Sequence, residues 1–532
     1  RKENPSFVVN KIYLDAYTQE KNAAGERYPD AKNRFDNLMK TGVMFMNYSG
    51  HGGYNNITNE LFMKTQDIRN MTNANQGFWF LATCSFSHFD GGIPSAGEEA
   101  VLNPHGGAVG VVSACRTVYA SQNKILNDHL CDTLFGHKDA FSYDMTIGRA
   151  VSIAKNMTGQ TQNKLPYVLL GDPALRLNYP TDYQIQTTTQ LDTIRALSVQ
   201  TVEGYIMTST GDTAHWFNGP MDITIWDKMQ QSITRDNDEP KEANKVKIPF
   251  NNYPNTLFAG QTIVENGKFS YTFMVPKDIR YNYGNGRIAY YAYDKESGEE
   301  GIGYCEDFVV GGSSTLEIID TIGPDLRLYI NNPAFVDGGK TYEFPHFYAE
   351  IYDENGINTV GSGIGHDLLL IVDNDPNQTF VLNDYFTARS NSYQQGTVSF
   401  KMPEMTEGAH SITFRAWDLL NNSNTAALNF QVVKGMNPTL YKVLTYPNPV
   451  AATGVLNFRI EFDQPDEVVQ TEIYLYDLSG RLIKTHKQVG TEGIQWNMNE
   501  LNATPGMYMY LLNIKTPTSE FVSKAGKIII TQ

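Results

Sequence analysis

The sequence predicts a multidomain chain in which one α/β sheet domain is followed by β-domains. Over residues 1–179, short apolar strands alternate with helical segments, which is the pattern of a mostly parallel sheet covered on both faces. After Tyr179 the helical periodicity ends, and alternating strands with Asn-Gly and Asp-Gly turns continue to Gln532. The segments RIAYYAYD and SITFRAWD end at Asp294 and Asp418, and 418 minus 294 gives a spacing of 124 residues. This repeat indicates two related β-sandwiches.

These observations divide the chain into four expected domains. Residues 1–179 are the α/β domain, 180–313 a first β-sandwich, 316–435 an Ig-like β-sandwich and 441–532 a small C-terminal β-sandwich. Because the two central sandwiches share the repeated strand, we expect both to be Ig-like.

Composition narrows the range of functions. A hydrophobic content of 41% and an aromatic content of 12% fit packed globular domains. The net charge of -16 argues against nucleic acid or an anionic membrane surface as the main partner, since both require clustered basic residues. No apolar run reaches the roughly 20 residues of a spanning helix. The polar start, RKENP, is not expected to be a signal peptide. The four cysteines lack a paired pattern and predict no disulfide framework.

Local patterns place the elements of the α/β domain. Ser95 and Glu98 have the spacing of a capping box that opens a short helix. We expect strands at 7–14, 43–46, 78–81, 108–112 and 167–170, and helices at 30–39, 122–135 and 144–157.

A histidine and a cysteine follow two of these strands. His51 lies in the stretch NYSGHGGYNN after residues 43–46, and Cys84 follows residues 78–81. Carboxyl ends of parallel strands meet at one edge of a sheet, and neighbouring strands are ~4.8 Å apart. The imidazole is therefore expected to face the thiol across a cleft, where it can act as general acid/base for a nucleophilic Cys84. The amides of Gly52 and Cys84 are the expected oxyanion donors. The alternative is that both side chains are structural, as a lone histidine or cysteine usually is.

Other histidines and cysteines fit this site less well. His105 precedes the strand at 108–112 and Cys115 follows it, so a strand of about seven residues separates them by ~23 Å. They are expected at opposite edges of the sheet, with Cys115 near Cys84 at the lining of the cleft. His88 is a rival base because it lies four residues after Cys84.

Three motifs of the α/β domain resemble one peptidase family. An apolar strand ends in Ser-Gly-His-Gly at residues 49–52, a second ends in Ala-x-Cys at 82–84, and LLGDPAL follows at 169–175. His51 and Cys84 are 84 minus 51, or 33, residues apart. This layout is that of caspase-like cysteine peptidases and most resembles the gingipain family, over about residues 1–180. The family's domain has an earlier half with an acidic residue that orients the histidine, and its motifs are not found here.

The C-terminal residues carry a second, independent resemblance. YPNP at 446–449, LYDLSGRL at 475–482, PGMY at 505–508 and KAGKI at 524–528 together resemble the sorting domain of type IX secretion cargo. This resemblance implies translocation across the outer membrane and a small β-sandwich at residues 441–532.

The two resemblances together imply a sortase-type gingipain at the cell surface. Its activity would be that of a cysteine endopeptidase that removes C-terminal sorting domains from type IX cargo. Transfer of the cargo to anionic lipopolysaccharide would make it a transpeptidase. Residues 441–532 would dock on the outer-membrane barrel PorV. No organic cofactor and no nucleic acid are implied.

Two further interpretations remain open at the sequence level. One is an ordinary secreted gingipain-like protease that sheds its own C-terminal domain; its chemistry would be the same, and only the sandwich arrangement and the family resemblance favour the sortase. The other is a non-enzymatic surface adhesin that keeps an inactive peptidase-like domain.

Metal binding is expected to be at most structural. His129, Cys131 and His137 do not match a zinc spacing. Residues 353–356 (DENG) and 373–375 (DND) resemble fragments of calcium loops, but we expect Asx turns there. The family resemblance leaves room for a structural calcium ion.

Overall fold

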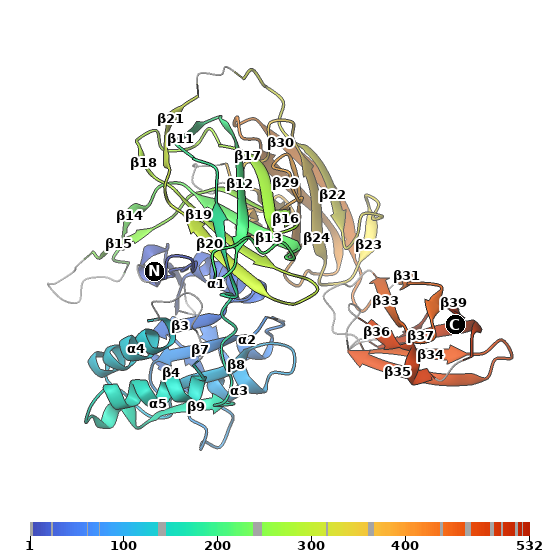
Figure 1. The fold of residues 1–532 in the computed structure, drawn as a ribbon, viewed down its shortest axis with the longest axis horizontal. Coiled ribbons are helices and arrows are strands. Elements are labelled where there is room, and N and C mark those ends of the chain that lie inside the picture. Colours follow the sequence, from blue (N-terminus) through green and yellow to red (C-terminus); the bar gives the residue numbers. More distant parts are fainter. Residues whose placement is uncertain are drawn as a thin grey trace. The chain divides into compact units, whose positions relative to one another are not determined.

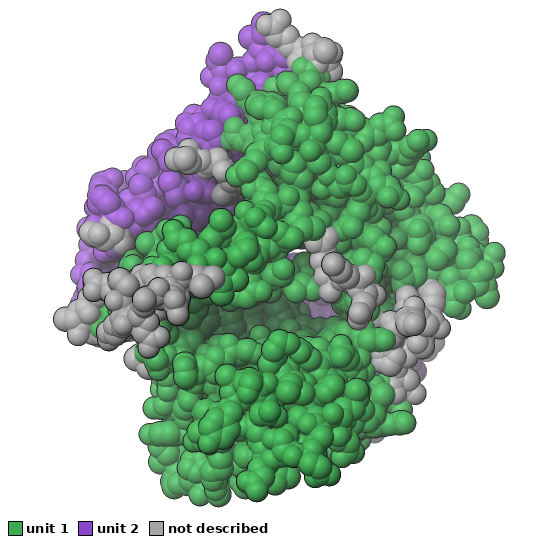
Figure 2. Space-filling view, turned by 90° about the vertical axis from the view of Figure 1, so that its left-hand side faces the viewer, with its two compact units in different colours: residues 1–317, 360–362, 390–393 green, residues 318–359, 363–389, 394–532 purple. Residues whose placement is uncertain are grey.

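The computed structural model (Figure 1) describes residues 4–531 except for several short segments. Those outside the description are 23–24, 61, 74, 137–144, 238–246, 315–317, 360–365, 437–439, 463–469, 490–493, 502–503, 516–519 and 524. The chain forms two compact units, coloured separately in Figure 2. The first contains residues 1–317 and the short segment 390–393; the second contains 318–359, 363–389 and 394–532.

A four-stranded sheet forms the centre of the α/β domain. Its order is β3 (Phe45–Ser49), β7 (Gly77–Ala82), β8 (Ala108–Ala114) and β9 (Tyr167–Gly171). The first three strands are parallel and β9 is antiparallel to β8. Every residue of β7 is buried, which explains its uninterrupted apolar sequence.

Helices cover both faces of this sheet (Figure 1). On one face, α4 (Ala120–Phe135) and α5 (Ile147–Met157) pack against even-numbered residues of β7 such as Phe80. On the other face, α1 (Pro29–Thr41), α2 (Thr65–Arg69) and α3 (Ala96–Leu102) pack against odd-numbered residues such as Trp79. Short elements complete the domain: η1 (Leu14–Ala16), β1 (Glu20–Asn22), β2 (Gly25–Arg27), β4 (Gly52–Gly53), β5 (Asn56–Ile57), β6 (Met63–Lys64) and η2 (Gln162–Lys164).

The expected strand at 7–14 is wrong. Residues 7–13 have no regular secondary structure, and Leu14 opens the 3-10 helix η1. The start of this segment is bonded to the first sandwich instead of to a strand partner: Arg287 donates to the carbonyls of Pro5 and Phe7. The strand expected at 43–46 is also displaced, because β3 begins at Phe45 and continues to Ser49. The start of the helix expected at 144–157 lies outside the described residues, as does His137.

The first β-sandwich follows within the same unit. A seven-stranded sheet and a three-stranded sheet enclose a core that contains Phe217, Phe273 and Val310. The large sheet runs β16 (Thr256–Val264), β13 (Gly219–Trp226), β19 (Arg287–Tyr293), β20 (Glu300–Cys305), β10 (Tyr183–Thr187), β12 (Val199–Met207) and β17 (Lys268–Met274). The small sheet runs β11 (Thr193–Ala196), β21 (Val309–Ser313) and β18 (Gly284–Asn285), and β14 (Gln230–Ile233) pairs with β15 (Pro249–Asn252).

The second unit contains two further pairs of sheets. In the first pair, one sheet runs β22 (Asp325–Ile330), β24 (His346–Tyr352), β28 (Gln395–Lys401) and β27 (Phe386–Ala388). Its partner runs β23 (Gly339–Thr341), β30 (Ser423–Val432), β29 (Gly408–Trp417), β25 (Leu369–Val372) and β26 (Thr379–Val381), with η3 (Pro376–Gln378) and η4 (Asn383–Tyr385) in its loops. Phe347 and Phe414 lie in the core between these two sheets.

The last pair of sheets is built from residues 440–531. One sheet runs β31 (Leu440–Tyr446), β33 (Val455–Phe462) and β36 (Ile494–Asn497). The other runs β32 (Val450–Ala451), β39 (Gly526–Thr531), β37 (Gly506–Lys515), β34 (Gln470–Tyr476) and β35 (Leu482–Val489), with β38 (Glu520–Val522) beside β37 and η5 (Met498–Leu501) after β36. Trp496 and Leu512 are buried in its core.

The repeated strand motif has the same role in both central sandwiches. Asp294 follows β19 and accepts hydrogen bonds from the amides of Glu296 (2.8 Å) and Ser297 (2.9 Å). Asp418 follows β29 and accepts bonds from the amides of Leu420 (3.0 Å) and Asn422 (2.6 Å). Each aspartate is buried and fixes the turn that leaves its strand.

Candidate functional site

The register of the parallel sheet places His51 and Cys84 at equivalent positions. Ser49 at the end of β3 is the partner of Ala82 at the end of β7. Each strand is followed two residues later by one of the two candidate groups. The Gly50 amide donates to the Ala82 carbonyl (3.4 Å), so the two chains still run side by side where they leave the sheet. Both groups thus emerge at the carboxyl edge, as expected for a site between neighbouring parallel strands.

The backbone of His51 is fixed while its side chain is exposed. The His51 carbonyl accepts hydrogen bonds from the Tyr48 hydroxyl (2.6 Å) and from the Thr58 amide (2.9 Å). Burial raises the pKa of Tyr48, which keeps its hydroxyl protonated as a donor. Within the described part of the chain, no side chain is hydrogen-bonded to the His51 ring. The loop therefore holds the position of the imidazole but leaves its ring free to contact a substrate or a base-orienting group.

The amide of Gly52 is available for a substrate oxygen. Gly52 pairs with Ile57 across the hairpin of β4 and β5. The Thr58 amide donates to the His51 carbonyl, so His51 and Thr58 form a hydrogen-bonded pair of this antiparallel hairpin. The next pair, Gly52 and Ile57, therefore exchanges no hydrogen bonds, and the Gly52 N–H points away from β5. A Cβ atom at Gly52 would lie 2.6 Å from Thr83 Oγ1. A side chain at this position would force Thr83 or the loop to move.

Cys84 lies in a constrained turn. Its half-buried Sγ is 3.4 Å from the Val118 amide and 3.5 Å from the Val118 carbonyl. The next residue, Ser85, has φ of 53°, a left-handed conformation that is uncommon for a residue with a side chain. Such strain often accumulates at functional sites. Among the described residues, the Cys84 amide has no hydrogen-bond acceptor. The Cys84 amide, like the Gly52 amide, is therefore left as a potential donor to a substrate oxygen.

The other candidates lie where the sequence predicts but have other contacts. His105 precedes β8 and Cys115 directly follows it, at opposite edges of the sheet. His88 Nε2 is 3.4 Å from Asp90 Oδ1, and Asp90 also accepts two bonds from Arg116, at 2.9 and 2.5 Å. The rival base is thus part of an ion-pair cluster that joins two loops.

Sequence reasoning missed three residues that shape this site. Val118 contacts the thiol through its backbone, so its residue type gives no signal. Thr83 is fully buried against Gly52, and its hydroxyl has no hydrogen-bond partner among the described residues. Ser85 has the strained backbone described above. The glycines of Ser-Gly-His-Gly indicate that another segment of the chain packs closely against them. This was the one sequence signal that pointed to Thr83.

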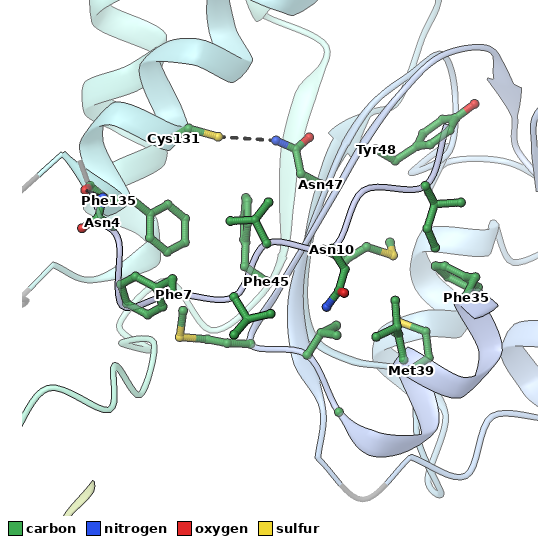
Figure 3. Close-up of a pocket in the computed structure, with 18 of the residues that line it drawn as sticks. Asn4, Phe7, Asn10, Phe35, Met39, Phe45, Asn47, Tyr48, Cys131 and Phe135 are labelled. Atoms are coloured by element: carbon green, nitrogen blue, oxygen red, sulfur yellow. Dashed lines mark hydrogen bonds between the residues drawn. The ribbon is translucent and has the colours of Figure 1, made fainter. Parts of the chain in front are cut away.

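A separate apolar cavity of about 930 Å³ lies along β3 (Figure 3). Residues from the 4–14 segment, α1, β3 and α4 line it, and neither His51 nor Cys84 is among them. Asn47 donates to Cys131 Sγ (3.4 Å) at its border, and burial raises the pKa of Cys131 to about 11. Because neither candidate catalytic group lines this cavity, it is not the candidate catalytic cleft.

An acidic cluster lies in the second unit. Carboxylate oxygens of Asp320, Asp353 and Asp418 lie within 4.8 Å of one another. Asp353 Oδ1 accepts bonds from the amides of Asn355 (2.7 Å) and Gly356 (3.0 Å), which confirms the expected Asx turn. Oxygen donors of this kind suit calcium.

Two segments of the chain match known family models. Residues 1–178 match Peptidase family C25, and residues 444–531 match the Secretion system C-terminal sorting domain. No curated protein matches the chain. In the described residues, no helix is long and apolar enough to cross a membrane.

Several solved structures are similar to the chain. Dimeric latent PorU from Porphyromonas gingivalis is 26% identical, with 80% of this chain and 41% of that chain covered and a TM-score of 0.34. The Arg-specific cysteine proteinase gingipain R is 15% identical, with 52% and 56% covered and a TM-score of 0.27. The complex of Porphyromonas gingivalis RgpB pro- and mature domains is 15% identical, with 52% and 57% covered and a TM-score of 0.26. The chain therefore spans about two fifths of the PorU chain and little more than half of the gingipain chains.

The family matches confirm both resemblances that the sequence predicts. Residues 1–178 are a gingipain-family domain, and residues 444–531 are a secretion-system sorting domain.

Proposed function

We propose that the gingipain-family domain is a cysteine endopeptidase with Cys84 as its nucleophile and His51 as its general acid/base. One observation carries the proposal: His51 and Cys84 each lie two residues beyond register partners on adjacent parallel strands. The match of residues 1–178 to a peptidase family supports it.

The reaction follows from the positions of these groups. His51 takes the thiol proton, and the thiolate attacks the carbonyl carbon of the scissile peptide bond. The amides of Gly52 and Cys84 donate to the oxyanion of the tetrahedral intermediate. His51 returns the proton to the leaving amine, and a thioester remains on Cys84. A water or an amine then attacks the thioester and releases the thiol.

The sorting domain suggests the biological context. We propose that the protein removes C-terminal sorting domains from type IX secretion cargo at the cell surface, in association with the outer membrane. An amine of anionic lipopolysaccharide would be the second acceptor for the thioester, which makes the enzyme a transpeptidase. Residues 441–532 would bind the barrel PorV, and the two central sandwiches would be Ig-like spacers. The presence of both family segments on one chain supports this proposal.

The test is cargo processing in cells that carry Cys84→Ala in the full-length protein. We expect cargo to accumulate with its sorting domain attached, while Cys305→Ala, which removes a free thiol in the first sandwich, processes cargo normally. Normal maturation in the Cys84→Ala strain would show that Cys84 is not the nucleophile.

A second measurement separates the sortase from an ordinary secreted protease. Mass spectrometry of the mature protein should detect peptides from residues 441–532 if the sorting domain is retained as a dock. Loss of these residues with retained peptidase activity would favour the secreted protease. An intact protein whose Cys84 ignores thiol-reactive probes would favour a non-enzymatic adhesin.

A further inference from the structure

Exposed apolar side chains gather at the edge of the sheet that bears His51 and Cys84. Four loops leave this edge, at residues 50–62, 85–95, 115–119 and 158–166. They carry five large side chains that form what we call the apolar rim: Tyr54 (43% exposed), Phe89 (50%), Ile93 (61%), Tyr119 (72%) and Leu165 (66%).

The concentration of these side chains is local. Between residues 4 and 178, eleven large apolar side chains are exposed in the described chain, and five of them belong to the rim. Three others, Leu102, Ile125 and Met157, lie on helices, and the remaining three, Val8, Val9 and Tyr13, lie in the irregular N-terminal segment. Exposed apolar groups that gather in one region of the surface, instead of being scattered singly, mark a binding surface.

Hydrogen bonds tie the four loops into one surface. The Ala96 amide, just after the second loop, donates to the Tyr54 carbonyl (2.7 Å) in the first. The Ser85 amide donates to the Arg116 carbonyl (3.2 Å), and the Cys115 amide donates to the Pro166 carbonyl (2.9 Å). Each pair of neighbouring loops is therefore linked, so the loops at the strand ends that bear His51 and Cys84 form one connected surface.

The charges of these loops argue against a basic substrate. The four loops contain two carboxylates, Glu60 and Asp90. Asp90 is neutralised by its paired bonds to Arg116, so it is not available to a substrate cation. Glu60 is the one remaining carboxylate and is half-buried. These loops thus offer a substrate five exposed apolar side chains but only one carboxylate that is not already paired.

We propose that the apolar rim is the substrate-binding surface of the enzyme and that it selects an extended peptide with aromatic or branched aliphatic side chains beside the scissile bond. A chain whose carbonyl lies between His51 and Cys84 must cross the loops of the rim on either side. Burial of one such side chain against Tyr119 or Phe89 strengthens binding by roughly tenfold or more. This proposal deepens the proposed function and rests on it.

The test uses the full-length protein and fluorescence-quenched octapeptides of Gly and Ser whose two central residues are Phe-Leu, Lys-Lys or Glu-Glu. We expect kcat/KM for the Phe-Leu peptide to exceed that of the others by roughly tenfold or more. Tyr119→Ser and Phe89→Ser should each lower it by about tenfold, mainly through KM. Ile125→Ser, an exposed apolar residue outside the rim, should leave it unchanged. Equal cleavage of all three peptides would overturn the proposal, as would a preference for Lys-Lys that Glu60→Gln removes.

A binding measurement keeps this test separate from the test of catalysis. Fluorescence anisotropy with a labelled Phe-Leu octapeptide and the Cys84→Ala variant reports recognition without turnover. Binding that Tyr119→Ser weakens, together with an absence of cleavage by the wild-type protein, would support the rim and contradict the peptidase. Cleavage that depends on Cys84, with no effect of the rim variants on binding or KM, would support the peptidase and overturn the rim.

Discussion

At the scale of single residues, the candidate site is defined by close backbone approach. The sequence could place His51 and Cys84 because each follows an apolar strand and parallel strands end at a common edge. It could not place the Val118 amide, which lies 3.4 Å from the thiol but comes from a loop 34 residues later. The left-handed turn at Ser85 was equally hidden, since serine shows no preference for that conformation. Side-chain chemistry was visible in the sequence, and backbone donors were not.

The contact between Gly52 and Thr83 gives a residue-scale prediction. An alanine Cβ at position 52 would lie 2.6 Å from Thr83 Oγ1, so the loop must shift and carry the Gly52 amide away from the oxyanion. We expect Gly52→Ala to lower kcat by about 100-fold, the usual cost of losing one oxyanion donor. Steady-state kinetics on a cleaved peptide measure this loss.

Gly53→Ala is the matched control. Its Cβ would meet nothing closer than Asn56 Oδ1 at 3.4 Å, which is an ordinary contact. We expect its kcat to stay near that of the wild-type protein. Similar losses in the two variants would mean that the hairpin, and not the Gly52 amide, is the sensitive feature.

At the scale of elements, buried strands were predictable and their partners were not. The strands expected at 78–81 and 108–112 lie inside β7 and β8, whose apolar runs reflect burial on both faces. The segment 7–14 has a similar apolar pattern because Phe7 and Leu14 pack against the two cores of the domain. Its backbone, however, bonds to Arg287, 280 residues after Phe7, and no local pattern reports such a contact. The antiparallel direction of β9 could not be predicted either, because no local sequence pattern reports how this strand pairs with β8.

The capping box of α3 gives an element-scale prediction. Ser95 Oγ accepts from the Glu98 amide (3.4 Å), and Glu98 Oε2 accepts from the Ser95 amide (2.8 Å), as the sequence predicted. Ser95 is fully buried. We expect Ser95→Ala to lower the free energy of unfolding by about 1 kcal/mol, the usual value of an N-cap hydroxyl. Urea unfolding followed by circular dichroism measures it. Glu98→Gln keeps an acceptor at the same place and should lower the free energy of unfolding by less than Ser95→Ala does. An equal or larger loss would show that the charge of Glu98, and not the capping box, stabilises the helix.

At the scale of the whole molecule, the aspartate that follows both β19 and β29 shows why the sequence could predict two related central sandwiches. In both sandwiches the same short motif closes the same kind of turn, so the spacing in sequence reported a repeated strand and turn. The surroundings of the two aspartates differ, and the motif alone gave no sign of this difference. Asp418 lies in a group of three carboxylates with Asp320 and Asp353.

This acidic cluster predicts an unusual pH dependence for the second unit. Burial, together with the charges of Asp418 and Asp320, raises the pKa of Asp353 to about 6. A carboxyl whose pKa is raised on folding binds its proton more tightly in the folded state, so stability increases as the pH falls through this value. Since one pKa unit corresponds to about 1.4 kcal/mol, the gain approaches roughly 3 kcal/mol before the pH reaches the unfolded pKa. Differential scanning calorimetry of the full-length protein in the presence of a chelator should show the melting transition of this unit move upward from neutral to mildly acidic pH.

Asp353→Asn tests whether the cluster is the cause. The amide removes one of the three charges while its oxygen still accepts from the Asn355 and Gly356 amides. The variant should therefore be more stable than the wild-type protein at neutral pH, and its transition should change less with pH than that of the wild-type protein, because burial still raises the pKa of Asp418. Calcium would act in the opposite direction, because it binds the ionised carboxylates and stabilises the wild-type unit most at neutral pH. A wild-type transition that falls on acidification in the presence of chelator would contradict a raised pKa of Asp353 as the dominant pH effect in this unit.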